Sequence, residues 1–207
     1  MSLTTPSGGI EELVDATSGK EIVVTSLLID QFAELAKKYK KYLIIQNDLE
    51  QWVKDHVKEV LLPSDINLFL QQTREYENHE SYEWNTGFFI SQLIQNSHHA
   101  ENTNFELDVN ALKPIDNLAS YVSGTEERMV KVIITGQAGH WCGCSAQYST
   151  FTIERAGDGC GFRAQHSTFN THNPLQYERF KKPVLQYNGN TLYLLSSDGS
   201  ILKGGPW

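Results

Sequence analysis

Apolar residues recur three or four positions apart through the first half of the chain, a spacing that predicts amphipathic helices. Asp48 and Ser64 are suited to begin two of these helices as N-cap residues, and Pro63 is suited to end one. The predicted helices cover residues 26–39, 49–60, 65–76 and 86–95. We therefore expect a helical module in this half of the chain.

A polar segment, residues 96–104, follows these helices and is the predicted linker to a second half with a different pattern. It contains His98 and His99, which we expect to be exposed to solvent. Beyond it, alternating or β-branched apolar residues predict strands. These lie at residues 105–109 and 130–135, and then at 184–186, 191–195 and 200–202, where turns at Asn188-Gly189 and Asp198-Gly199 predict a three-stranded meander.

Between these strands the chain repeats itself. Residues 138–151 (AGHWCGCSAQYSTF) recur as residues 156–169 (AGDGCGFRAQHSTF) at a constant offset of 18 positions, and nine of the fourteen aligned residues are identical. A short repeat that carries glycines and a β-prone Ser-Thr-Phe is typical of the coils of a β-solenoid. In such coils Phe151 would stack on Phe169 in the interior, and glycines would occupy the sharp corners. The corner glycines are Gly139, Gly143, Gly157 and Gly161.

An earlier, degenerate coil is predicted ahead of these two. An alignment shifted by 19 positions places Gly124 beside Gly143 and residues 130–132 beside residues 149–151. So short a stack needs its ends covered, because about three repeats are usually required for stability. The helical module and the meander are the predicted covers.

The pattern predicts an α+β fold in four parts. These are an arm (residues 1–20), an acidic helical module (21–100), β-solenoid coils of about 18 residues each (101–174) and a β-meander cap (175–207). The charge changes near the same place as the apolar pattern, from a net −10 over residues 1–110 to a net +2 over residues 111–207. This coincidence favours a domain boundary there.

At 207 residues, with 40% apolar and 20% charged residues, the chain has the composition of a globular protein. Its net charge of −8 disfavours binding to nucleic acid, because an acidic surface repels phosphate. The sequence shows no secretory signal pattern and no apolar run long enough for a membrane span. Three cysteines, all within residues 142–160, do not make an even-numbered disulfide framework. We therefore expect a reduced, cytoplasmic or particle-associated protein without membrane contact.

The repeat also resembles a known family. Segment 134–143 carries the whole pattern I-x-G-x-A-G-x-x-x-G. Segment 153–161 carries part of it, with Arg155 in place of the first glycine. The pattern is similar to that of the glycine-repeat right-handed β-helix, which closes the large subunit of glutamate synthase and forms a subunit of formylmethanofuran dehydrogenase. The resemblance covers about 40 residues. It implies a packing scaffold that holds no catalytic residues.

His140, Cys142, Asp158 and Cys160 are the candidate metal ligands. The repeat aligns Asp158 with His140 and Cys160 with Cys142, so an extended backbone would place all four side chains on one face. Nitrogen, sulfur and oxygen ligands in that arrangement suit Zn²⁺. The alternative is that the glycines bend this segment, in which case the cysteines fill a narrow coil and His140 lies in water.

A thiol enzyme is the other chemical alternative. Cys142 or Cys144 is the candidate nucleophile, and the candidate bases are His140, His166 and His172. Small buried cysteines that only fill space would look the same in the sequence. The chain contains no phosphate-binding G-x-x-x-x-G-K-[ST] loop, no G-x-S-x-G elbow and no H-E-x-x-H motif.

These observations favour a non-enzymatic structural or protein-interaction component of a larger assembly, with no bound cofactor. Its contact site would be a face or an edge of the solenoid, with residues 1–20 ordered at the contact, because an uncovered edge leaves backbone groups free to pair. A virion, a phage particle or another multi-subunit particle would suit such a chain. The expected partner is a protein or a second copy. The competing hypothesis is a thiol- or zinc-dependent enzyme that uses His140, Cys142 and Cys160.

Overall fold

The computed structural model describes residues 32–187 and 189–206. The chain divides into two compact units, residues 1–38 and residues 39–207. In the first unit the described residues are helical, as the apolar spacing predicts for that segment. The predicted arm, the start of the first predicted helix and Asn188 of a predicted turn lie outside the described residues.

Ahead of its sheet, the second unit has a helical segment that ends at residue 43, followed by three helices and a 3₁₀ turn. They are α3 (Leu49–His56), α4 (Pro63–Gln72), η1 (Thr73–Tyr76) and α5 (Tyr82–His99). Their shared core is aromatic, since Phe89 of α5 stacks on Phe69 of α4 at a centroid distance of 5.8 Å and Tyr39 meets both rings edge-on. Burial of such large apolar side chains supplies most of the stability of amphipathic helices.

The predicted helix starts are close to those observed. Asp48 is the N-cap of α3 as predicted, although its side chain makes no capping hydrogen bond. α4 begins at Pro63 instead of after Ser64. The physical reason is that proline suits the first turn of a helix, where its missing N–H is not needed.

Polar side chains of α5 explain why α3 is shorter and α5 longer than the sequence predicts. α5 continues through Asn96 and His98, so the first part of the predicted linker is the last turn of a helix. Asn96 Nδ2 donates to the carbonyl of Val57 at 2.9 Å, and this bond holds the residue after α3 in an extended conformation. His98 Nε2 donates to the carbonyl of Arg128 at 3.1 Å. His98 is only 2% exposed, which corrects the expectation that it lies in solvent.

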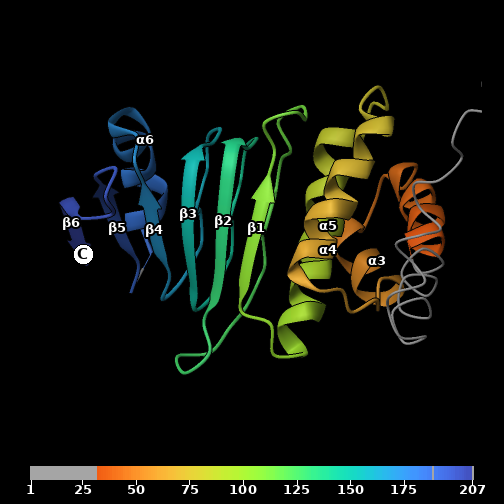
Figure 1. Ribbon diagram of the computed structural model, residues 1–207, viewed down its shortest axis with the longest axis horizontal. Coiled ribbons are helices and arrows are strands. Elements are labelled where there is room, and N and C mark those ends of the chain that lie inside the picture. The colour runs from red at the N-terminus through yellow and green to blue at the C-terminus, as the bar shows by residue number, and fades with distance from the viewer. Residues whose placement is uncertain (1–31, 188, 207) are drawn as a thin grey trace, which may run out of the picture. The chain divides into compact units, whose positions relative to one another are not determined.

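The second half of the chain builds one six-stranded sheet whose strands lie side by side in sequence order, as Figure 1 shows. The strands are β1 (Asn104–Asp108), β2 (Val130–Gln137), β3 (Ser149–Arg155), β4 (Thr168–Thr171), β5 (Thr191–Leu195) and β6 (Ile201–Pro206). Neighbouring strands from β1 to β5 run parallel, and β6 runs antiparallel to β5. The unit is therefore a mixed α/β structure with a mostly parallel sheet.

The strand register follows the sequence repeat. Phe151 of β3 is the register partner of Phe169 of β4, as the offset of 18 predicts. Val130 of β2 is the partner of Ser149, as the offset of 19 predicts for the degenerate coil. Both phenylalanines are fully buried, so the predicted interior stacking of this pair is confirmed.

Three segments between strands share one backbone path. We call residues 115–123, 139–147 and 157–165 corner 1, corner 2 and corner 3. Successive corners are joined by backbone hydrogen bonds at equivalent positions; Gly157 N, for example, donates to Gly139 O at 2.9 Å. Each corner also has three residues with positive φ at the same places, which in corner 2 are Trp141, Gly143 and Ser145. The path therefore repeats even where the residue types differ.

The predicted alignment of Gly124 with Gly143 is wrong. Gly124 N donates to Gln147 O at 3.0 Å, so Gly124 lies near the end of corner 2 and not beside its central glycine. The cause is an extra turn at residues 124–129, closed by hydrogen bonds between Thr125 and Arg128. It makes the offset between corners 1 and 2 equal to 24 positions, although the strands that follow are offset by 19.

The predicted meander is only partly correct. Residues 191–195 and 200–202 do lie in or beside an antiparallel hairpin, β5 and β6, with a turn at Asp198-Gly199. Residues 174–185 instead form a helix, α6 (Pro174–Leu185), so the first predicted strand does not exist. The Asn173 side chain caps this helix by accepting from Leu175 N at 2.9 Å, and Val184 is buried on its inner face. An N-cap Asn followed by Pro is a helix-start signal that outweighs the local β preference of Val184.

The two edges of the sheet end differently. At β1, two side chains of α4 bind the backbone of Asp108: its N–H donates to Asn67 Oδ1 at 2.9 Å, and its carbonyl accepts from Gln71 Nε2 at 2.6 Å. At the other end, β6 pairs with β5 on one side, and no strand of the described residues pairs with its other side. Figure 1 shows α4 beside β1 and β6 at the far end of the sheet.

Candidate functional site

Two of the candidate cysteines lie inside the stacked corners. Cys142 and Cys160 occupy the same place in corners 2 and 3, where they are 0% and 1% exposed. Burial raises the pKa of the Cys160 thiol, and the neighbouring Cys142 raises it further. A thiol that is kept protonated in an apolar site is a poor nucleophile and a poor metal ligand.

Cys144 is the most exposed of the three free thiols, at 8%. Its Sγ lies 3.6 Å from the hydroxyl of Ser145. Burial raises the pKa of the Cys144 thiol, against the opposing effects of the Ser145 hydrogen bond and the Arg163 charge. Burial therefore disfavours the thiolate form that a nucleophilic Cys144 would need.

The other two candidate zinc ligands lie on the outside of the corners. His140 Nδ1 accepts a hydrogen bond from the backbone N–H of Asp158 at 3.0 Å, so this ring joins corner 2 to corner 3. The Asp158 carboxylate accepts from Arg179 of α6 at 2.7 Å, and this guanidinium lowers the pKa of Asp158. Both groups are thus used to hold neighbouring segments in place.

The four candidate ligands are brought together as two pairs and not as one set. His140 and Asp158 are exposed, whereas Cys142 and Cys160 are buried. The reason is the positive φ of alternate corner residues, which breaks the extended backbone that would put all four side chains on one face. Within residues 32–187 and 189–206, no three His, Cys, Asp or Glu side chains are grouped so that they could hold a metal ion.

The remaining candidate bases make other contacts. The His166 ring stacks on Tyr148 with centroids 5.0 Å apart and planes 9° from parallel. His172 Nδ1 donates to the carbonyl of Ser196 at 2.8 Å, which links the end of β4 to the hairpin. In the described part of the chain, no hydrogen bond joins a histidine ring to a cysteine thiol, so no Cys–His pair is formed.

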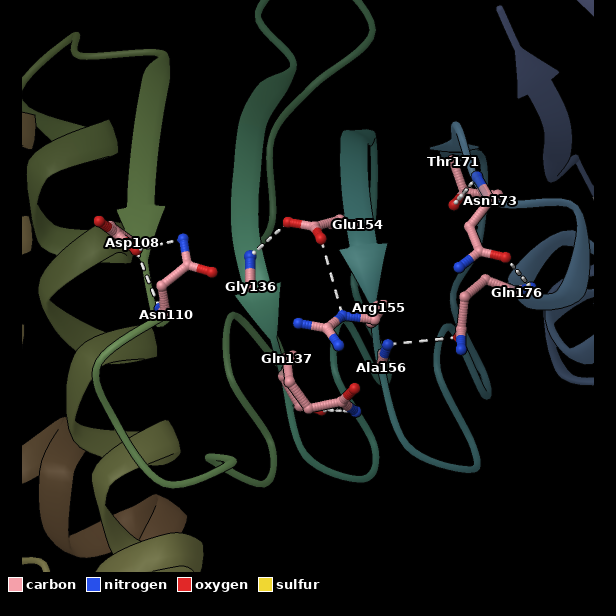
Figure 2. A network of polar contacts seen from close by, with 11 residues as sticks. Asp108, Asn110, Gly136, Gln137, Glu154, Arg155, Ala156, Thr171, Asn173 and Gln176 are labelled. Carbon is pink, nitrogen blue, oxygen red and sulfur yellow. Dashed lines mark hydrogen bonds and ion pairs between the residues drawn. The ribbon is translucent and has the colours of Figure 1, made fainter. Parts of the chain in front are cut away.

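A polar network runs along the carboxyl ends of β1 to β4, as Figure 2 shows. In it Glu154 Oε2 accepts from Gly136 N at 2.8 Å, and Gln176 Oε1 accepts from Ala156 N at 3.3 Å. Arg155 lies 3.7 Å from Glu154, and both side chains are about half exposed, so this pair adds little stability. The network joins β2 to β3 and joins the segment after β3 to α6.

An open pocket of about 500 Å³ lies between corner 3 and α6. Phe162, Phe180 and Lys182 line it, together with Asp158 and Arg179. The last two are already paired with each other at 2.7 Å, so most of the charge at this pocket is internally compensated. Cys160 also lines this pocket, but it is only 1% exposed and burial raises the pKa of its thiol, so it is not poised as a nucleophile there.

The sequence did not predict the role of α6. Its residues Tyr177 and Glu178 contact β6 through Lys203, whose ammonium lies 3.0 Å from the Glu178 carboxylate and 5.2 Å from the Tyr177 ring centroid. The Asn173-Pro174 pair was the available signal for this helix, and recognising it would have placed these side chains beside the hairpin.

No helix in the described part of the chain has both the length and the apolar character needed to cross a membrane. Comparison with protein-family models, with curated proteins and with solved structures found no match in any of the three. No family is therefore assigned to this chain.

Proposed function

We propose that this chain is a non-enzymatic structural or protein-interaction component of a larger assembly, and that its repeats form a short β-solenoid. The proposal is supported by the way one repeat follows another, since each adds one strand to the sheet and one corner to the row of corners. A stack of this kind is stabilised by contacts between neighbouring repeats and presents an extended, rigid surface. The resemblance to the glycine-repeat β-helix, a packing scaffold, points in the same direction.

The observation that carries the proposal is the placement of the repeated cysteines. Cys142 and Cys160 fill the interior of two consecutive corners, and the pKa of Cys160 is raised by burial. An enzyme that used these thiols would need them deprotonated and within reach of a substrate. Their environment suits small apolar groups that allow the corners to stack closely.

The unequal ends of the sheet support an assembly role. α4 covers the β1 edge, whereas β6 presents an edge that is open within the described residues. Proteins seldom leave a long strand edge unprotected, because its N–H and C=O groups pair readily with another strand. We propose a protein partner and not a nucleic acid, because the chain carries a net charge of −8.

Metal analysis of the purified protein separates this proposal from the zinc-enzyme hypothesis. The wild type, Cys142→Ser and the control Cys144→Ser should all contain zinc at the level of the buffer. One zinc per chain that is lost in Cys142→Ser and retained in Cys144→Ser would overturn the proposal in favour of a metal site. Sedimentation of the protein in an extract of the cells that produce it tests the assembly role, and a monomer there would contradict it.

A further inference from the structure

The side of corner 3 that faces away from corner 2 points to a binding site. We propose that the pocket between corner 3 and α6 binds an acidic peptide segment of a partner protein, whose backbone lies against corner 3 as corner 3 lies against corner 2. The inference rests on the assembly role proposed above, and it names the contact site and the chemistry of the partner.

The first argument is the set of backbone bonds that joins one corner to the next. Corner 2 presents a carbonyl, an N–H and a second carbonyl toward corner 3, and the backbone of corner 3 bonds to all three. The bonds run from Gly157 N to Gly139 O, from Trp141 N to Asp158 O and from Gly161 N to Cys142 O, each at 2.9 Å. A segment that followed corner 3 in the same way would therefore offer a donor, an acceptor and a donor.

Corner 3 presents the same three groups without a further corner to receive them. The equivalent groups are Gly157 O, Gly159 N and Cys160 O, and no described residue forms a hydrogen bond with any of them. Gly159 has φ +75° where Trp141 has φ +60°, so its N–H takes the orientation that in corner 2 points to the next corner. The three residues with unpaired groups line the pocket of about 500 Å³. Water can bond to these groups in an open pocket, and a bound peptide would take its place.

The second argument is the charge around the pocket. Arg179 and Asp158 compensate each other, but Lys182, which also lines the pocket, forms no ion pair with a described residue. The Arg163 guanidinium lies 5.3 Å from the ring centroid of Phe162, another lining residue, and it too has no acidic partner in the described part of the chain. Two uncompensated cations in a chain with a net charge of −8 favour an acidic ligand at this place.

The third argument is the apolar wall of the pocket. The Phe162 ring meets Trp141 and Tyr187 edge-on, with centroid distances of 5.4 and 5.5 Å, so two neighbours hold it in place. Phe180 of α6, at 1% exposure, is fixed by its own burial. Ligand pockets usually have a volume of about 300–1,000 Å³, apolar walls and a few backbone groups that orient the ligand. This pocket has all three features.

A peptide fits these features better than a small organic acid does. A carboxylate can accept from Lys182 and from Gly159 N, but it has no donor for the carbonyls of Gly157 and Cys160. A peptide backbone supplies donors and acceptors together, and an acidic side chain on it supplies the charge.

A second copy of this chain cannot extend the row of corners end to end. At the opposite end α5 lies directly on corner 1, where Asp116 O leaves no room for a Cβ at Gly87. Gln95 of α5 also binds this corner, since its Oε1 accepts from Ser123 N at 2.7 Å. Corner 1 of one copy is therefore not free to receive corner 3 of another, which favours a different protein as the partner.

Selection of binders from a phage-displayed library of random peptides, with the full chain as the target, gives the test. We expect the enriched peptides to contain Asp or Glu. A synthetic copy of an enriched peptide should bind Lys182→Gln at least about tenfold more weakly than the wild type. The matched control is Lys181→Gln, since Lys181 is paired with Glu178 at 2.5 Å and does not line the pocket. Equal melting temperatures for the three proteins would show that the variants are folded.

Amide resonances of the wild type report the backbone bonds directly. The synthetic peptide should shift the Gly159 N–H resonance and leave that of Gly124 unchanged, because Gly124 N is already bonded to Gln147 O. Succinate at the same concentration is the control for a small organic acid, and it should leave the Gly159 resonance in place. Failure to enrich acidic peptides, equal affinity for the wild type and Lys182→Gln, or an equal shift with succinate would each overturn the inference.

Sedimentation in an extract of the producing cells separates this inference from the proposed function. A complex that is lost in Lys182→Gln and kept in Lys181→Gln would support the contact at the pocket. A complex that both variants keep would overturn this contact and leave the assembly role standing. A wild-type monomer would overturn the assembly role and, with it, the inference.

Discussion

The rings of Phe151 and Phe169 stack with their centroids 4.8 Å apart and their planes 12° from parallel. The spacing matches that of neighbouring strands in a sheet, and the two residues are register partners in β3 and β4. Identical residues at an offset of 18 therefore fall directly beside each other in the interior. This pair links the sequence repeat to the packing of the sheet.

The first prediction concerns this pair. Phe151→Leu and Phe169→Leu should each destabilise the protein, because both rings are fully buried. In a double-mutant cycle the two changes should show a coupling of about 0.5–1.5 kcal/mol, the range for a stacked aromatic pair. Denaturant unfolding of the wild type, the two single variants and the double variant measures this quantity. Strictly additive effects would mean that the rings do not interact.

The second prediction concerns the left-handed glycines. Gly161 has φ +70°, and a Cβ there would lie 2.6 Å from Val184 Cγ2 and 2.9 Å from Phe169 Cζ. Gly161→Val should cost at least about 1 kcal/mol, because backbone strain and overlap add together. Gly199→Val is the matched control, since Gly199 has φ +83° with no atom within 4 Å of its Cβ position.

The two glycine variants should therefore differ. Both variants place valine in a left-handed conformation that favours glycine, but only Gly161→Val also crowds its neighbours. The difference between their unfolding free energies therefore reports the packing of corner 3. Cys160→Ser should cost less than Gly161→Val, because serine is similar in volume to cysteine and adds only one polar group. If Gly199→Val were as destabilising as Gly161→Val, the close packing at corner 3 would be contradicted.

The third prediction concerns the thiols. Burial raises the pKa values of Cys144 and Cys160, so at neutral pH the native protein should react with a thiol reagent far more slowly than the unfolded chain. Cys144 should react first, since it is the most exposed of the three. Mass spectrometry after timed alkylation identifies the order, with Cys144→Ser as the control that removes the fastest site. Rapid labelling of Cys142 or Cys160 in the native protein would favour the thiol-enzyme hypothesis.

The fourth prediction concerns pH. Desolvation lowers the pKa of His98 below its usual value of 6.5, and the charges of Arg128 and His99 act in the same direction, against the hydrogen bond to the Arg128 carbonyl. The unfolded chain therefore takes up this proton at a higher pH than the native protein does. The stability that neutral His98 contributes is complete above about pH 6.5 and falls as the pH drops through the native pKa.

Unfolding at pH 7.5 and pH 5.5 measures this effect. The loss of stability between the two pH values should be larger in the wild type than in His98→Gln, because the variant has no group at this position that titrates in the interval. His99→Gln is the control for the neighbouring histidine. An equal loss in the wild type and in His98→Gln would show that His98 titrates alike in the native and unfolded states.

The sequence could predict the register of the repeat because nine identities at one offset leave no other alignment of β3 and β4. It could not predict the length of α5, because the polar residues that continue this helix are held by distant backbone groups. Asn96 bonds to Val57 and His98 bonds to Arg128, and neither partner is close in the sequence. Judged by local composition alone, the same residues are typical of a linker.

The sequence could predict which candidate residues are neighbours, but not whether their side chains share one face. The repeat brings Cys142 beside Cys160 and His140 beside Asp158, as the alignment implies. Whether the two pairs share a face depends on the backbone between them, and the residue with positive φ there is Trp141. A left-handed tryptophan is not expected from propensity, since this conformation disfavours residues other than Gly, Asn and Asp. Contacts with the next corner stabilise it, so local sequence did not reveal it.

The central claim is that the repeats stack as successive coils of a scaffold, and nuclear Overhauser contacts in the protein in solution test it most directly. The account predicts ring-to-ring contacts between Phe151 and Phe169 and backbone contacts between Thr150 and Thr168, which are register partners in neighbouring strands. It also predicts contacts between Val132 and Phe151, one repeat earlier. Folded strands at residues 149–155 and 168–171 that lack these contacts would contradict the account.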